Sequence, residues 1–141
     1  MANTELIKNK FPDEPLPSDG KIVNYTIENG RIKGIEGLKN ADFVITKDGE
    51  LIIGKRHHFL GNGQDVMAAG QLKINGNGQI KGIDNLSGHY RPAVSEAMNY
   101  PDLFRNLGLD LNNTWINLYD IQINSTGDVV KLTPIYTKIL K

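Results

Sequence analysis

The sequence has 141 residues, 39% of them hydrophobic, and its 16 basic and 16 acidic residues cancel to a formal net charge of zero. This length fits one domain that buries about two thirds of its unfolded surface. No apolar stretch reaches the roughly 20 residues of a transmembrane helix, and no basic excess favours a membrane surface. Neutrality also disfavours nucleic-acid binding through phosphate contacts alone, although an enzyme needs only a local basic cleft. The absence of cysteine excludes disulfides, zinc–thiolate sites and cysteine nucleophiles.

The first twenty residues form a proline-rich lead-in. Pro12, Pro15 and Pro17 lie among acidic residues and serine, a composition that cannot hold a regular element. Residues 1–10 lack the apolar core of a secretory signal, so we expect no signal peptide of the chain's own. The domain itself is expected to span residues 21–141.

From residue 21 onward, short segments of apolar and β-branched residues are separated by turns rich in glycine and asparagine. Asn29-Gly30 is the strongest of these turn signals, and similar turns recur through the chain. We expect a mainly β (α+β) domain, an antiparallel meander sheet of six or more strands. The strands are expected over residues 21–28, 31–35, 43–46, 50–53, 71–74, 79–83, 115–123 and 129–139.

One helical excursion interrupts the strands near residues 92–107. Pro92 can open a helix, and residues 93–98 are good helix formers. Pro101 ends this helix or starts another, which Gly108 would cap.

All three histidines lie in the central third of the chain, each beyond the end of an expected strand. His57 and His58 open a glycine-rich loop, and His89 lies in the run Ser87-Gly88-His89-Tyr90-Arg91-Pro92. Strands two apart in an antiparallel meander run in the same direction. We therefore expect both loops to leave from one edge of the sheet, with His57 and His89 within about 10 Å of each other.

Two imidazoles at one site can divide general acid and general base work, because the pKa of histidine lies near neutrality. A guanidinium can hold a phosphate, and a phenol can stack on a base. The expected catalytic residues are His57, His89, Tyr90 and Arg91, and the expected substrate-binding residues are His58, Ser87, Gln71 and Arg56. This set suits metal-independent cleavage of RNA or of a nucleotide such as NAD.

Structural interpretations of the same residues stay open. The two adjacent histidines can belong to a solvated loop, and Tyr90 can pack in the core while His89 caps a carbonyl group. Arg56 and Arg91 can be ordinary surface charges. No metal site is expected, since adjacent histidines on a strand point to opposite sides and cannot easily share an ion.

The segment His57-His58-Phe59-Leu60-Gly61-Asn62-Gly63, then Ala68-Ala69-Gly70 and the Ser87-to-Pro92 hexapeptide, resembles a domain with two known settings. One is the plant IQ-motif calmodulin-binding proteins, and the other is the C-terminal domains of bacterial Rhs-type polymorphic toxins. The resemblance covers roughly residues 42–110 and is specific at the hexapeptide. The chain departs from the plant pattern at His58 and Phe59, where that pattern has two serines. It also has Gln71 where bacterial members often carry an acidic residue.

The resemblance implies an effector domain used in bacterial competition, which a larger scaffold delivers into the cytoplasm of a target cell, with a cognate immunity protein as a possible partner. No IQ segment is visible, so calmodulin is not expected as a partner. The leading hypothesis is a toxin-type enzyme that acts on RNA or a nucleotide and needs no cofactor. One alternative is an ADP-ribosyltransferase-like domain that uses NAD as its substrate. The other is a non-enzymatic protein-binding module.

Overall fold

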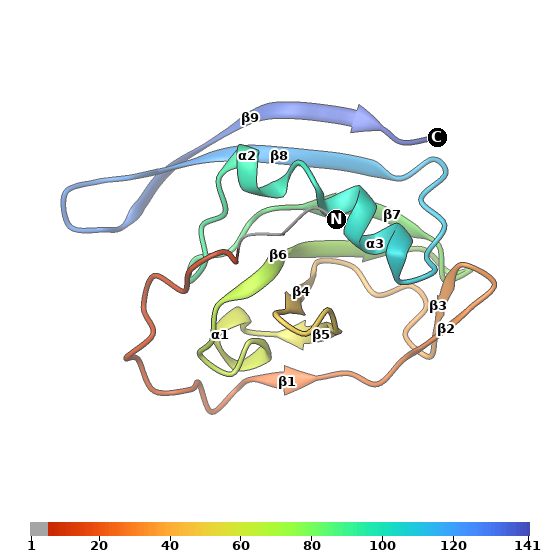
Figure 1. Cartoon of the computed structure of the whole chain (residues 1–141), viewed down its shortest axis with the longest axis horizontal. Coiled ribbons are helices and arrows are strands. Elements are labelled where there is room, and N and C mark those ends of the chain that lie inside the picture. Colours follow the sequence, from red (N-terminus) through yellow and green to blue (C-terminus); the bar gives the residue numbers. More distant parts are fainter. Residues whose placement is uncertain (1–5) are drawn as a thin grey trace.

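A computed structural model of the chain describes residues 6–141 and confirms the mainly β class (Figure 1). One sheet has seven strands in the order β1-β5-β4-β6-β7-β8-β9, and a separate pair is formed by β2 and β3. The strands are β1 (Lys21–Ile22), β2 (Thr26–Glu28), β3 (Arg31–Lys33), β4 (Ala41–Thr46), β5 (Leu51–Lys55), β6 (Val66–Ile74), β7 (Ile80–Asp84), β8 (Trp115–Ile123) and β9 (Val129–Ile139).

The turns that the sequence predicts join antiparallel strands. Asn29 and Gly30 have φ values of 53° and 78°, the left-handed conformation that a tight two-residue turn between β2 and β3 requires. The long C-terminal hairpin of β8 and β9 has the bounds expected from the sequence. In Figure 1 the tip of this hairpin projects beyond the rest of the molecule.

The sheet is mixed, because β7 and β8 pair in parallel. The helical excursion between them brings the chain back to the same end of the sheet, as a parallel pair needs. The order of neighbours also differs from a simple meander, since β4 lies between β5 and β6. As a result β5 and β7 run in opposite directions, and the expectation that they run in the same direction is wrong.

Three short helices are present in residues 6–141: α1 (His57–Leu60), α2 (Val94–Ala97) and α3 (Tyr100–Asn106). The last two occupy the predicted helical region, and Pro101 lies in the first turn of α3, where its missing N–H costs nothing. α1 was not predicted, since the sequence indicated a glycine-rich loop at the two histidines. No helix of the described chain is long and apolar enough to cross a membrane.

The core lies between one face of the sheet and the helices. Phe43 of β4 makes edge-to-face contacts with Tyr100 and Phe104 of α3, at centroid distances of 6.0 and 5.1 Å. Side chains alternate along strands, so the neighbours of Phe43 point to the other face. Asp42 is one of them, and its Oδ2 lies 3.9 Å from Nδ1 of His57 in α1.

The described part of the lead-in, residues 6–20, packs against the domain instead of standing apart from it. Ile7 is fully buried and forms an antiparallel bridge with Val66. Asn9 is also buried. Residues 1–5 of the expected lead-in lie outside the described residues.

Candidate functional site

The structure brings α1 and the Ser87–Pro92 loop together, although β5 and β7 run in opposite directions. β7 is short and ends at Asp84, whose carboxylate accepts a hydrogen bond from the backbone N–H of Gln71 in the middle of β6. Asp42 of β4 pairs with Gln71 on one side and with Gly54, near the end of β5, on the other. The end of β7 and the end of β5 therefore lie at the same height along the sheet. The chain segments that follow β5 and β7 therefore meet over the sheet.

The three histidines form one cluster, called here the histidine cluster (His57, His58 and His89). The rings of His58 and His89 are stacked, with centroids 4.6 Å apart and an interplanar angle of 12°. His57 adjoins His58 in α1, and the charge of His89 contributes to lowering its pKa. This arrangement joins the two segments that the sequence singled out.

His58 has a structural role, because the protein satisfies both of its ring nitrogens. Its Nδ1 accepts a hydrogen bond from the amide of Asn9 at 2.9 Å, and its Nε2–H donates to the carbonyl of Glu14 at 2.6 Å. The residue is only 1% exposed. His58 therefore fixes the N-terminal segment and has no nitrogen left for a substrate, contrary to its expected binding role.

His57 is buried and neutral. Its Nε2–H donates to the carbonyl of Gly70 at 2.7 Å, which leaves Nδ1 unprotonated toward Asp42. Burial lowers the pKa of His57 more than the charge of Asp42 and the hydrogen bond to Gly70 raise it. At neutral pH this side chain is consequently unprotonated at Nδ1 and a weak base, so it has no proton to give to a leaving group.

His89 is the most accessible of the three, with 23% of its side chain exposed. Its Nε2 lies 2.8 Å from Oε1 of Glu14, and its ring meets the edge of Phe11 at 5.6 Å. Nδ1 has no hydrogen-bond partner within residues 6–141. A carboxylate that accepts from one imidazole nitrogen orients the ring and leaves the other nitrogen basic. His89 and Glu14 thus have the geometry of a general base and its orienting group.

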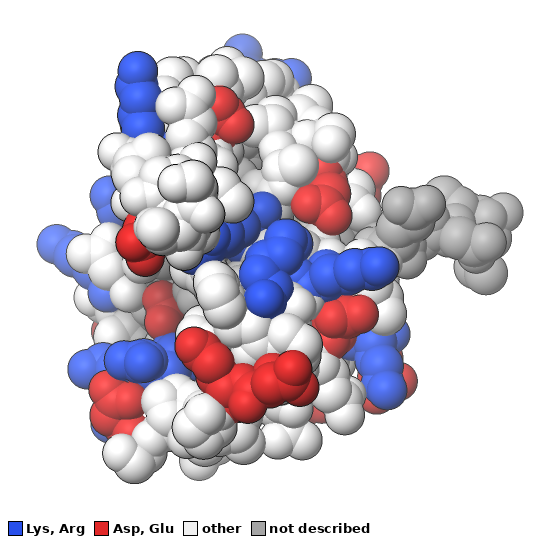
Figure 2. All heavy atoms as spheres, turned by 90° about the vertical axis from the view of Figure 1, so that its left-hand side faces the viewer, with Lys and Arg blue, Asp and Glu red and all other residues white. Residues whose placement is uncertain are grey.

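Two cations flank His89. The ammonium of Lys10 donates to the carbonyl of Tyr90 at 2.8 Å, and the guanidinium of Arg91 lies 4.9 Å from the ring centroid of Phe11. Arg91 also donates from Nε and Nη1 to the carbonyls of Gly88 and Gly127, so it ties the loop to the tip of the β8–β9 hairpin. Figure 2 shows this end of the molecule, where basic side chains gather in the middle and acidic ones surround them.

Tyr90 packs in the core, and Ser87 stabilises the loop. Tyr90 has no exposed surface, and its hydroxyl donates to the carbonyl of Gln64. Burial raises its pKa to about 12. The hydroxyl of Ser87 accepts from the backbone N–H of Tyr90 at 3.2 Å. The expectation that Tyr90 contacts a substrate is therefore not supported, because its ring is enclosed by the protein.

The other two expected binding residues lie away from His89. Arg56 has a positive φ of 73° and pairs with Asp19 at 3.3 Å on an exposed part of the surface. Gln71 belongs to a different cleft, on the sheet face next to Asp84. Neither side chain joins the histidine cluster.

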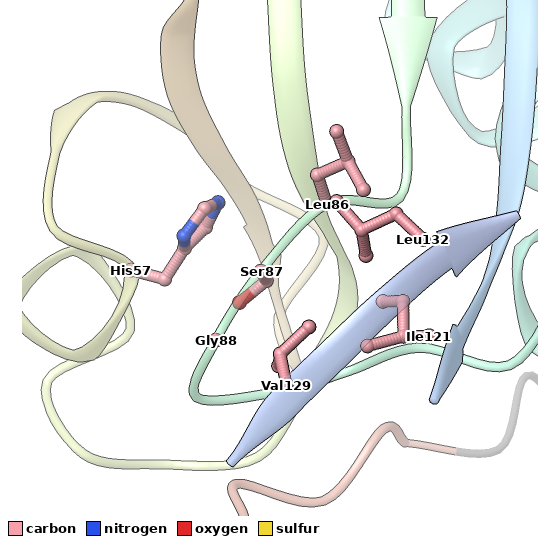
Figure 3. Close-up of a pocket in the computed structure, with 7 residues that line it drawn as sticks. All are labelled: His57, Leu86, Ser87, Gly88, Ile121, Val129 and Leu132. Atoms are coloured by element: carbon pink, nitrogen blue, oxygen red, sulfur yellow. The ribbon is translucent and has the colours of Figure 1, made fainter. Parts of the chain in front are cut away.

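A pocket of about 220 Å³ opens between the histidine cluster and the C-terminal hairpin. Its lining, shown in Figure 3, consists of His57, Leu86, Ser87, Gly88, Ile121, Val129 and Leu132. His57 lies on one side of this histidine pocket, and the apolar residues of β8 and β9 lie on the other. The pocket offers an apolar wall and a single imidazole, beside the loop that carries His89.

Asn9, Glu14 and Asp42 are the contributors that the sequence did not reveal. Asn9 and Glu14 lie in the segment interpreted as a lead-in, 49 and 75 positions before the histidines they contact. Asp42 starts a strand and has no motif around it. No local sequence pattern predicts that Asn9 and Glu14 contact residues so far along the chain.

Comparison with known proteins adds no relative to this geometry: no family model, curated protein or solved structure matches the chain.

Proposed function

We propose that this chain is a toxin-type effector domain that cleaves RNA or a nucleotide by histidine acid–base chemistry. The observation that carries the proposal is the Glu14–His89 pair, held at 2.8 Å beside Lys10 and Arg91. A base with an orienting carboxylate and two neighbouring cations suits metal-independent phosphate-ester cleavage, in which a proton is removed and negative charge develops on the phosphate.

In this proposal His89 removes the proton from the attacking 2′-hydroxyl group of RNA through its free Nδ1. The hydroxyl oxygen then forms a bond to phosphorus, the bond from phosphorus to the 5′-oxygen breaks, and the leaving oxygen takes a proton from water. Glu14 stabilises the imidazolium that results, as a carboxylate does in other acid–base pairs. Nη2 of Arg91 has no hydrogen bond within residues 6–141, and its proposed part is to bind a phosphate oxygen. His57 lines the neighbouring pocket as a neutral side chain, so its proposed part is to shape the substrate site.

Expression of the wild-type chain and of His89→Ala in a bacterium tests the proposal. Growth arrest that requires His89, together with loss of intact RNA, supports RNA cleavage, whereas loss of NAD supports the nucleotide-consuming alternative. Circular dichroism of His89→Ala controls for folding. Growth arrest that persists unchanged in a folded His89→Ala variant contradicts the proposal.

Glu14→Gln provides a second and more specific test. If Glu14 stabilises the protonated imidazole, its loss removes that stabilisation. The variant should then keep some activity, and the limb of the pH–rate profile that reports the base should move to lower pH. A profile identical to that of the wild type would assign Glu14 to folding alone.

A non-enzymatic binding module is the second candidate, and the C-terminal hairpin favours it. Of the ten large hydrophobic side chains that are exposed in residues 6–141, six lie on β8 and β9: Trp115, Ile123, Val129, Val130, Leu132 and Ile135. Exposed apolar patches of this kind often mark interaction surfaces. Growth arrest that survives in His89→Ala but is lost in Val130→Ser, a residue outside the histidine pocket, would favour this candidate, and the reverse result would favour the enzyme.

A further inference from the structure

A second cleft lies on the sheet face opposite Phe43, where β6, β7 and β8 meet. Six polar side chains line this polar cleft: Asn40, Gln71, Lys73, Asp84, Asn117 and Tyr119. The strand register explains how they converge. Asp84 and Asn117 are direct partners in the parallel pair, and Gln71 shares their face because its neighbour Leu72 pairs with Ile83.

The side chains of the polar cleft are largely unused by the protein. Within residues 6–141, Asn40, Gln71, Lys73, Asn117 and Tyr119 make no side-chain hydrogen bond. Asp84 uses one carboxylate oxygen, Oδ1, to accept from the backbone N–H groups of Gln71 and Leu86 at 2.8 and 2.9 Å, and its Oδ2 has no partner there. These side chains are exposed or half-buried, and polar groups that converge on one cleft without internal partners are free to bind a ligand.

The chemistry of the lining selects a neutral ligand rich in hydroxyl groups. Amide groups both donate and accept, and a carboxylate oxygen accepts from hydroxyls. The ammonium of Lys73 offsets the carboxylate of Asp84, so the cleft favours neither a phosphate nor a cation. Tyr119 supplies an aromatic ring on the same face.

The size and the rim of the cleft fit part of a sugar ring. Its volume is about 70 Å³, so it can take the hydroxyl-bearing edge of a ring while the rest of the ring stays outside. Trp115 lies directly beside Gly82 in the parallel pair and is 47% exposed. The aliphatic part of Lys73 covers Gly82, so Trp115 lies at the rim of the cleft, outside its lining.

We propose that the polar cleft binds a sugar ring through Asp84, Asn117 and Gln71, with Tyr119 and Trp115 beside it. The ring can be the ribose of a nucleotide or a free sugar, since both present the same hydroxyl groups. The raised pKa of Asp84, about 6 because of burial, agrees with a carboxylate kept from bulk water at a binding site. The site does not depend on the proposed cleavage at His89.

Titration of the isotope-labelled full chain by NMR tests this inference, with D-ribose, adenosine monophosphate, D-glucose and 2′,3′-dideoxyadenosine as probes. We expect saturable shifts of the Gln71 and Asn117 amides with at least one of the three hydroxyl-bearing probes. Shifts with adenosine monophosphate and ribose identify ribose as the ligand, and shifts with glucose identify a free sugar. Equal shifts with the dideoxy probe, or no saturable shifts with any probe, overturn the proposal.

Asn117→Ala is the diagnostic variant and Asn112→Ala its matched control, because Asn112 is exposed on a loop outside the cleft. Loss of a hydrogen-bonding amide is expected to weaken binding about tenfold in Asn117→Ala and to leave it unchanged in Asn112→Ala. Equal affinity in both variants contradicts the assignment. His89→Ala should bind the probes normally, so failure of the cleavage proposal and failure of the sugar site remain distinguishable.

Discussion

The histidine cluster and the polar cleft lie on neighbouring parts of the molecule but differ in how many of their side-chain polar atoms are hydrogen-bonded within the protein. In the cluster, both nitrogens of His58 and one nitrogen each of His57 and His89 are taken by other groups of the protein. In the cleft, five of the six polar side chains have no hydrogen bond within the described residues. The histidines thus mainly hold segments together, while amide side chains on strand faces remain available to a ligand.

The cluster should therefore contribute mainly to the stability of the fold, and the cleft mainly to ligand binding. Substitution in the cluster should cost stability, because each lost ring leaves buried partners without a hydrogen bond. Substitution in the cleft should cost binding and leave stability unchanged or improved. His89 is the intermediate case, since it is paired but still partly exposed.

The largest effect is expected for His58→Ala, which should lower the free energy of unfolding by about 3 kcal/mol. The substitution removes a fully buried ring and leaves the amide of Asn9 and the carbonyl of Glu14 unpaired. Urea unfolding followed by circular dichroism measures the change. His89→Ala is the matched control and should lose about 1 kcal/mol or less, because its ring is partly exposed and makes a single ion pair. Equal losses in the two variants would contradict the division of roles.

Acidification should weaken the histidine cluster. The folded-state pKa of His57 is lowered by burial, so its contribution to stability is present above the unfolded value of 6.5 and is lost as the pH falls below it. Where the unfolded chain holds one more proton than the folded chain, the free energy of unfolding falls by about 1.4 kcal/mol per pH unit. Asp42 and His89 are the charged groups that face His57, and Asp42 moderates the loss.

Urea unfolding between about pH 7.5 and about pH 5.5, the range in which histidine titrates, measures this slope. His57→Gln can keep a donor toward Gly70 and cannot take up a proton, so it should flatten the pH dependence. An unchanged slope in the folded variant would assign the dependence to other groups.

The polar cleft should respond to pH with the opposite sign. Burial raises the pKa of Asp84 from 3.8 to about 6, the charge of Asp42 adds to this rise, and Lys73 opposes it. A raised acid pKa means that the contribution of Asp84 to stability is full below the unfolded value of 3.8 and is lost as the pH rises through about 6. At neutral pH the ionised carboxylate is therefore a net cost to folding.

Asp84→Asn should accordingly raise the free energy of unfolding at neutral pH by about 1–2 kcal/mol. The amide oxygen of asparagine can still accept from the N–H groups of Gln71 and Leu86, so the local hydrogen bonds survive. Binding of the sugar probes should weaken in the same variant, so that the substitution raises stability and lowers affinity. A destabilised Asp84→Asn protein would show that the carboxylate is needed for the fold.

The strands could be predicted from the sequence because their causes are local. Alternating apolar residues and left-handed turn residues such as Asn29 and Gly30 specify hairpins without reference to the rest of the chain. The parallel pairing of β7 with β8 and the place of β4 between β5 and β6 depend on long-range packing. The short helix at His57 escaped prediction because it is a single turn whose residues also suit a loop.

The candidate site was predictable only in part, for a similar reason. The motif around His89 identified a segment that meets His57 and His58, but not which side chains would be enclosed. Tyr90 was interpreted as a substrate holder, and its burial follows from the shape of the whole core. The partners Asn9 and Glu14 come from the far N-terminal segment, and a single sequence carries no signal that pairs them with the histidines.

The smallest effect is expected at Arg91, which connects the His89 loop to the C-terminal hairpin through the carbonyls of Gly88 and Gly127. Arg91→Ala removes both donors and should lower the free energy of unfolding by about 1 kcal/mol. The backbone of Arg91 has a φ of 42°, a conformation that glycine adopts without the cost of a Cβ. Arg91→Gly should therefore be less destabilising than Arg91→Ala, although both lack the guanidinium. In both variants the amide of Gly127, which donates to Asn124 in the hairpin turn, should exchange faster with solvent. Unchanged exchange at Gly127 would show that the hairpin holds its position without Arg91, and the two regions would then be coupled only through the sheet.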